Sequence, residues 1–185
     1  MNRKYLQKFQ IKDVVFLAIM SAVALATCAV MPLVISQPLI FGISQLVTAL
    51  QIGVFFAIGL YKVRKPGSLL IMALMMGLIQ LMMSPPMFLS SVLNGILIEL
   101  IVLLLFRGYE KDAAVFVAAM LHTPLSLPFN YLYNRLIKGA DSPLAAVADR
   151  APLAAVGMTL AVVAVSALGA LIGIKIAREL KNLEC

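Results

Sequence analysis

The sequence predicts an all-α, polytopic membrane protein, and three observations lead to that prediction. Of the 185 residues, 63% are hydrophobic and only 12% are charged, with a mean hydropathy of +1.03. A soluble domain is nearer half apolar and a quarter charged. The apolar residues form continuous runs, unlike the alternating strands of a membrane barrel. Six runs approach the roughly 20 residues that a spanning helix needs, so we expect a six-transmembrane-helix bundle in one domain, residues 1–185.

The first three predicted helices end at turn-forming segments. Residues 14–31 form the first run, which stops at Pro32. A basic segment precedes this run, but no clear small-residue cleavage site follows it, so we interpret it as a retained span and not a signal peptide. The second run covers about residues 39–61 and ends at a basic turn, 62–67. The third run, 68–83, is short.

The last three predicted helices differ in how polar they are. The fourth run, 87–106, is apolar apart from a few residues on one side. The fifth, 113–136, contains Pro124 and Pro128, which bend or break a helix and free backbone carbonyl groups. Those carbonyl groups must find other partners within the membrane. The sixth run covers residues 151–174.

The basic residues predict the orientation of these helices. With the N-terminus inside, all of the fifteen Lys and Arg residues except Arg135, Lys138 and Arg150 fall in cytoplasmic segments. Cytoplasmic loops carry such an excess. We therefore expect both termini in the cytoplasm and a location in a bacterial-type cytoplasmic membrane. Because the basic residues gather at the ends of spans, the net charge of +7 indicates membrane topology and lipid contact, not nucleic-acid binding.

Glu99 lies inside an apolar run, whereas the other seven acidic residues lie in tails or between runs. A carboxylate at bilayer depth costs about 2.5–3.5 kcal/mol on insertion scales, and retained ones are usually functional. Ser91, Gly95 and Glu99 recur every fourth residue and share a helix face, with Asn94 beside it. We expect Glu99 to face a pocket open to the exterior. For Ser91 and Gly95 taken alone, a seam packed on a neighbouring helix is the simpler interpretation.

A second polar stripe follows the fifth predicted helix, also at a spacing of four. Its members are His122, Ser126, Asn130 and Asn134, with Tyr131 and Tyr133 beside them. If the fourth and fifth helices are neighbours, His122 lies near the depth of Glu99. The two side chains then either contact a ligand or form a buried pair with each other.

The sequence lacks the residue sets that common enzyme classes need. It contains no Ser/His/Asp set, His/Cys cluster, glycine-rich phosphate loop or HExxH motif. Its two cysteines, Cys28 and Cys185, provide neither a disulfide framework nor a metal-binding spacing. We therefore expect no enzyme activity, no cofactor and no metal site. A membrane-embedded enzyme or assembly factor is the hypothesis with the least support.

The first predicted helix carries small residues on one side. Ala18, Ala22 and Ala26 are each four residues apart. Small residues at this spacing allow another helix to approach closely. The partner helix is either another protein or a neighbour within the bundle.

Taken together, these features resemble the substrate-binding S components of energy-coupling factor (ECF) vitamin transporters. The resemblance rests on small size, six spans, inner termini and the first-helix segment 14–26. Its more specific parts are Arg64-Lys65-Pro66-Gly67 and Asn94-Gly95-Ile-Leu-Ile-Glu99. Within that family the chain is similar to the YkoE type, which is implicated in uptake of thiamin or its hydroxymethylpyrimidine precursor.

The resemblance implies a mechanism and partners. An S component captures a vitamin outside, docks on a transmembrane coupling protein carried by two ATPases, and releases its load inside. The alanine face would be the docking surface, and the loop 32–38 would be the gate. The implied substrate-binding residues are Glu99, Asn94, Ser91, His122, Ser126, Asn130, Tyr133, Asn134 and Gln37.

Two alternatives stay open at this point. A cationic thiazolium would suit Glu99 by charge. The chain has no Trp, on which thiamin-binding S components commonly stack their ligand, so a neutral pyrimidine or another small nutrient is the alternative. The other functional hypothesis is a stand-alone secondary transporter that uses Glu99 as a proton or cation site.

Overall fold

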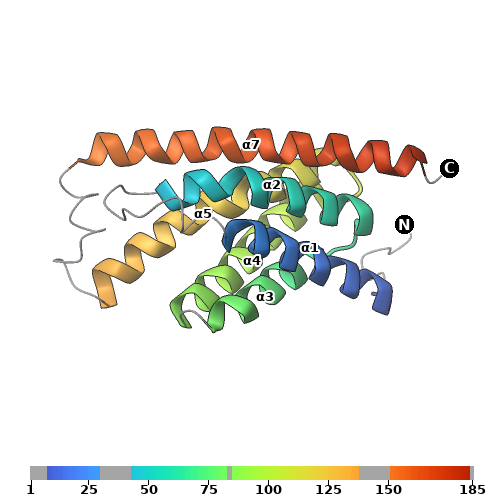
Figure 1. The fold of residues 1–185 in the computed structure, drawn as a ribbon, viewed down its shortest axis with the longest axis horizontal. Coiled ribbons are helices and arrows are strands. Elements are labelled where there is room, and N and C mark those ends of the chain that lie inside the picture. The colour runs from blue at the N-terminus through green and yellow to red at the C-terminus, as the bar shows by residue number, and fades with distance from the viewer. Residues whose placement is uncertain (1–7, 30–42, 83–84, 138–150, 184–185) are drawn as a thin grey trace.

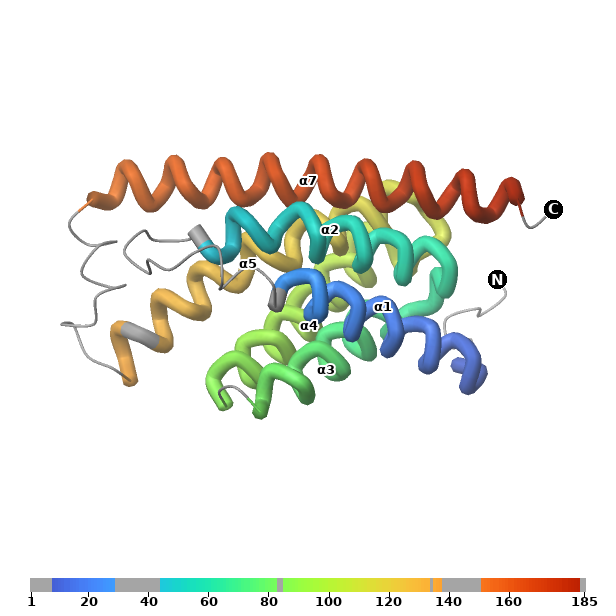
Figure 2. Tube along the Cα trace, in the orientation of Figure 1, coloured from blue at the N-terminus to red at the C-terminus, as the bar shows by residue number. Residues whose placement is uncertain are grey.

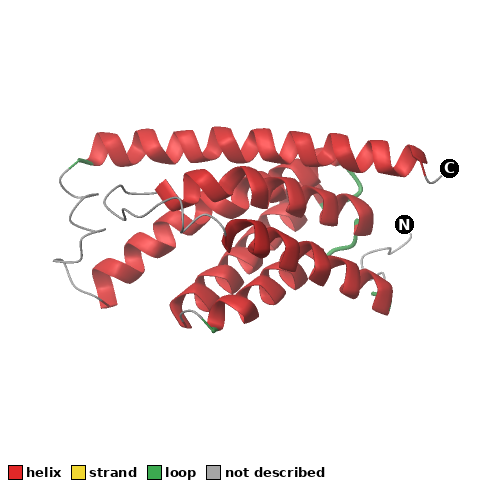
Figure 3. Ribbon diagram, viewed as in Figure 1, coloured by secondary structure: helices red, strands yellow, loops and turns green. Residues whose placement is uncertain are grey.

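The computed structural model describes residues 8–29, 43–82, 85–137 and 151–183, which are nearly all helical (Figure 1, Figure 3). The helices are α1 (Ile11–Ala29), α2 (Ile43–Val63), α3 (Ser68–Leu81), α4 (Pro85–Phe106), α5 (Asp112–Ile137) and α7 (Pro152–Leu183). No strand occurs in these ranges, so the all-α prediction is confirmed there. Five of these helices are long and apolar enough to cross a membrane, whereas α3 is shorter.

The helices match the six predicted runs, with shifted ends. Helix α1 begins at Ile11, before the predicted start, because the Asp13 carboxylate accepts a hydrogen bond (2.9 Å) from the Gln10 N–H and caps its first turn. Helix α7 continues to Leu183, past the predicted end at residue 174. Its last turns contain Lys, Arg, Glu and Leu, which favour helix without being apolar throughout.

Neighbouring helices follow the order α1, α2, α7, α5, α4, α3, with α3 also next to α1, and α2 contacts α5 and α3 as well. Figure 2 shows α2 running along α7. The start of α1 and the end of α7 lie at the same end of the bundle, on the right in Figure 1. This arrangement is the one that the predicted orientation requires. We call this end the terminal end and the other the far end.

Large apolar side chains cover the outside of the bundle. Leu104 on α4 is 81% exposed and Leu153 on α7 is 88% exposed. The buried core holds Leu17, Phe56 and Met72 from three helices. An apolar exterior of this extent fits a bilayer and not water.

Close packing of α7 against α2 depends on two glycines. A Cβ atom at Gly169 would lie 2.4 Å from the Leu50 carbonyl oxygen, and one at Gly173 would lie 2.4 Å from that of Val54. Backbone atoms on both sides cannot yield to such a contact. These glycines therefore set the separation of α2 and α7.

We expect Gly169→Ala to destabilise the protein by about 1–3 kcal/mol, because the new methyl group forces the two helices apart. Thermal unfolding in detergent measures this loss. Gly157→Ala is the matched control on the same helix, since a Cβ there meets nothing within 4 Å. The control should be neutral or stabilising by up to about 1 kcal/mol. Equal melting temperatures for the two variants would show that the α2–α7 contact is looser than described.

Charged residues tie the terminal end together. Asp112 at the start of α5 pairs with Arg64, which precedes α3, and with Arg178 near the end of α7. Lys65 pairs with Asp13 of α1 at 2.6 Å. These ion pairs connect the turn before α3 directly to α1 and α5, and through Asp112 to α7.

Candidate functional site

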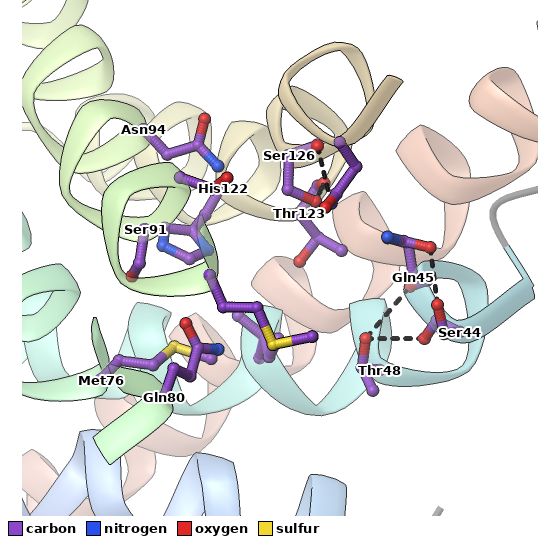
Figure 4. A pocket seen from close by; sticks show the side chains of 14 residues that line it. Ser44, Gln45, Thr48, Met76, Gln80, Ser91, Asn94, His122, Thr123 and Ser126 are labelled. Carbon is purple, nitrogen blue, oxygen red and sulfur yellow. Dashed lines mark hydrogen bonds between the residues drawn. The ribbon is translucent and has the colours of Figure 1, made fainter. Parts of the chain in front are cut away.

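A cavity of about 260 Å³ lies toward the far end of the bundle. It is bounded by the start of α2, the end of α3, the start of α4 and the second half of α5 (Figure 4). Its polar lining consists of Ser44, Gln45, Thr48, Gln80, Ser90, Ser91, Asn94, His122, Thr123, Ser126 and Asn130. Ile52, Met76 and Met87 are apolar parts of the wall, and none of the lining residues that the structure describes is Lys, Arg, Asp or Glu.

Three buried atoms of the lining have no hydrogen-bond partner among the residues described. They are Asn94 Oδ1, His122 Nε2 and Thr123 Oγ1. Their residues are only 1%, 5% and 3% exposed. Buried polar atoms are nearly always paired, and an unpaired one costs about 1–3 kcal/mol. The cavity therefore offers donors and acceptors that a bound molecule can satisfy.

Two prolines shape α5 without ending it, because the helix runs unbroken from Asp112 to Ile137. Pro124 has no N–H to give to the carbonyl of Met120, four residues earlier. That carbonyl instead accepts a hydrogen bond from Ser166 Oγ of α7 at 2.8 Å. The expectation that freed carbonyls find new partners is confirmed here. His122, between Met120 and Pro124, also packs its ring on Phe56, with 4.3 Å between centroids.

Glu99 does not line this cavity. Its Oε1 accepts a hydrogen bond from the Gly67 N–H at 2.6 Å, and its Oε2 accepts one from the Tyr109 hydroxyl at 2.9 Å. The prediction that Glu99 faces an outward-open pocket is therefore wrong. The alternative, a buried Glu99–His122 pair, is wrong too. The Glu99 oxygens bind Gly67 and Tyr109, and His122 Nε2 has no partner in the described chain.

Glu99 instead caps the N-terminus of α3 from the neighbouring helix. A helix N-terminus has N–H groups without intrahelical partners and a partial positive charge, both of which favour a carboxylate. Gly67, the residue before α3, has φ of 92°, a conformation that suits glycine, and supplies no side-chain cap itself. Burial and the Glu99 carboxylate raise the pKa of the Tyr109 hydroxyl, which keeps it a donor.

The match with known families covers most of the chain. Residues 11–181 match the model of a family described as hypothetical bacterial integral membrane protein (Trep_Strep). The chain belongs to the Trep_Strep family. No curated protein and no solved structure matches it. The family and the apolar helices together establish a bacterial multi-pass membrane protein.

The Ser91 face of this Trep_Strep protein packs on α3. Ser91 Oγ donates a hydrogen bond to the Ala73 carbonyl at 2.9 Å, and a Cβ at Gly95 would lie 2.6 Å from that of Ala73. The seam interpretation of Ser91 and Gly95 is thus confirmed, although Ser91 also reaches the cavity. Asn94, beside this face, is the α4 residue whose buried oxygen has no described partner.

Of the other predicted substrate-binding residues, some line the cavity and others do not. Ser126 and Asn130 line the cavity, but Ser126 Oγ donates to the Thr123 carbonyl at 2.7 Å and Asn130 Nδ2 donates to the Ser126 carbonyl at 3.0 Å. Tyr133 is not among the lining residues. Gln37 and the side chain of Asn134 lie outside the described parts of the chain.

Sequence reasoning missed part of the Trep_Strep cavity. Ser44 and Thr48 are four residues apart at the start of α2, a spacing that could have been recognised as a polar face. Thr123 is adjacent to His122 and carries one of the unpaired oxygens. Gln80 was overlooked because it stands alone near the end of an apolar run.

The small residues of α1 lie on the outside of the Trep_Strep bundle. Ala22 and Ala26 are exposed and Ala18 is half-buried. The opposite side of the helix buries Leu17 and Ser21. Packing within the described bundle therefore does not explain why residues 22 and 26 are small.

Proposed function

We propose that this Trep_Strep protein is the substrate-binding, S-component-type subunit of an energy-coupling factor importer, without enzyme activity of its own. Its cavity would take a small uncharged heterocycle, such as hydroxymethylpyrimidine. The observation that carries the proposal is the set of unpaired buried atoms of Asn94, His122 and Thr123 at one cavity. Ligand sites combine apolar walls with a few placed polar groups in this way.

The charge of the cavity favours an uncharged ligand over thiamin. A buried charge is costly unless it is paired. The thiazolium of thiamin would find no carboxylate among the described lining residues, and both Glu99 oxygens already bind protein donors. The amino or hydroxyl group of such a pyrimidine can donate to Asn94 Oδ1. A ring nitrogen can accept from His122 Nε2, or the hydroxyl can donate to it, so these groups match the unpaired atoms.

The position of the cavity supports capture from outside. It lies toward the far end, which is the external end if both termini are cytoplasmic. A substrate that enters there must later be released at the opposite side. Energy for that release would come from partner ATPases attached to a coupling protein.

A binding screen tests this proposal. The detergent-purified protein is titrated with hydroxymethylpyrimidine, thiamin and other B vitamins, and its melting temperature is recorded. We expect the uncharged pyrimidine to raise the melting temperature and thiamin to raise it less. No shift with any of these compounds, or a larger shift with thiamin, contradicts the proposed substrate class. In liposomes, uptake driven by a pH gradient without ATPases would instead indicate a secondary transporter.

We expect Ala22→Trp to block coupling while sparing substrate binding. Ala22 is exposed on α1, and an indole there prevents the close helix approach that docking on the coupling protein requires. ATP-driven uptake into liposomes containing the coupling module should fall at least about tenfold. Leu104→Trp, at an exposed site on α4, is the control and should transport normally. Normal uptake by Ala22→Trp would remove α1 from the docking surface.

A further inference from the structure

A second cavity, of about 500 Å³, lies at the terminal end between α1, α2 and α7. It is separate from the first cavity, and the described lining residues of the two cavities are all different. Phe16, Ile58 and Leu180 form apolar parts of its wall, one from each helix. Nothing in the proposed substrate mechanism uses this space.

The rim of the second cavity is basic. Lys62, Arg64 and Lys181 line it, and no Asp or Glu does among the residues that the structure describes there. The Arg64 guanidinium is held in place, because it lies 4.0 Å from the centre of the Tyr61 ring and pairs with Asp112. Asp112 is shared by Arg64 and Arg178, so one carboxylate faces two guanidinium groups. The local charge is therefore positive.

The cavity lies where a helix leaves the apolar layer. Along α7, Leu171 and Ile172 are exposed and apolar, and basic residues begin at Lys175. Basic residues at the ends of spans lie at the level of lipid headgroups. The apolar wall at Phe16 and Ile58 thus meets cations at the ends of the spans.

We propose that this cavity binds one anionic phospholipid of the cytoplasmic leaflet. The phosphate contacts Lys181, on the rim that Arg64 also lines. Part of an acyl chain lies against Phe16 and Ile58, and the rest of the lipid stays in the bilayer. The charge complementarity favours an anionic lipid over a zwitterionic one, and the apolar walls favour a lipid over a soluble phosphate.

The test is a lipid titration followed by native mass spectrometry of the full chain in detergent. Dioleoylphosphatidylglycerol is compared with dioleoylphosphatidylcholine. We expect one phosphatidylglycerol to bind preferentially and Lys181→Gln to weaken it about fivefold. Lys175→Gln is the matched control, because it removes the same charge from an exposed site of α7 that does not line the cavity.

Three outcomes overturn the proposal. Equal binding of both lipids removes the role of the basic rim. An equal loss in Lys175→Gln shows a general charge effect and no site. Displacement of the lipid by equimolar glycerol phosphate or inorganic phosphate assigns the rim to a soluble anion. Circular dichroism of each variant confirms that it is folded.

Discussion

Glu99→Ala is expected to destabilise the protein by about 2–5 kcal/mol, because it leaves one buried and one partly buried donor without an acceptor. The Gly67 N–H and the Tyr109 hydroxyl both donate to this carboxylate, which is 6% exposed. The N-terminus of α3 also loses the negative charge that complements its dipole. Thermal unfolding in detergent, supported by the yield of folded protein, measures the effect.

Two further variants separate the parts of this effect. Tyr109→Phe removes one of the two hydrogen bonds, so we expect a loss of about 1–2 kcal/mol. Glu179→Ala removes an exposed acid of α7 and should change stability by less than about 0.5 kcal/mol. If Glu99→Ala unfolded like the wild type but lost ligand binding, the carboxylate would belong to the substrate site after all.

Asn94→Leu is expected to weaken binding of hydroxymethylpyrimidine by about a hundredfold, or about 2.8 kcal/mol, while leaving the protein folded. The carboxamide oxygen of Asn94 has no hydrogen-bond partner among the described residues, so its removal costs the fold little. Replacing an unsatisfied buried polar group by an apolar one of similar shape is often neutral or stabilising. His122→Phe should behave in the same way.

The control for this prediction is Ser126→Ala. Ser126 also lines the cavity, but its hydroxyl already donates to the Thr123 carbonyl. We expect binding by Ser126→Ala to change by less than about threefold. Isothermal titration gives the affinities and thermal unfolding gives the stabilities. A loss of stability in Asn94→Leu as large as that in Glu99→Ala would mean that Asn94 serves the fold.

The helices were predictable because a bilayer demands long apolar segments that satisfy their own backbone groups. Local chemistry decided their ends. Asp13 extends α1 toward the N-terminus, and the helix-forming residues after 174 extend α7. Capping and helix propensity contribute little to the hydropathy of a segment, so the apolar runs alone could not locate the helix ends.

The candidate site was predictable in part. The spacing of Ser91, Gly95 and Glu99 correctly placed them on one face, but the sequence did not indicate which helix that face meets. It packs on α3, where Ala73 contacts Gly95 and Gly67 binds Glu99. Glu99 therefore binds the N-terminus of α3, and its hydrogen bonds there offset the cost of burying the carboxylate. Tyr109, its second partner, follows the helix in a connection that sequence periodicity does not describe.

The stripe along α5 was the better guide to the cavity. His122, Ser126 and Asn130 line it as their spacing predicted. Asn94 joins them from α4, at the edge of the face that packs on α3. Substrate binding by these residues stays a prediction.

We infer that an uncharged ligand occupies the cavity at Asn94 and His122 without help from Glu99. The most direct measurement is a calorimetric titration of hydroxymethylpyrimidine and of thiamin into the wild type, Asn94→Leu and Glu99→Gln, each shown to be folded. We expect saturable one-to-one binding of the pyrimidine, which Asn94→Leu weakens about a hundredfold and Glu99→Gln retains. Tighter binding of thiamin, lost in Glu99→Gln and kept in Asn94→Leu, would show that Glu99 and not Asn94 holds the ligand.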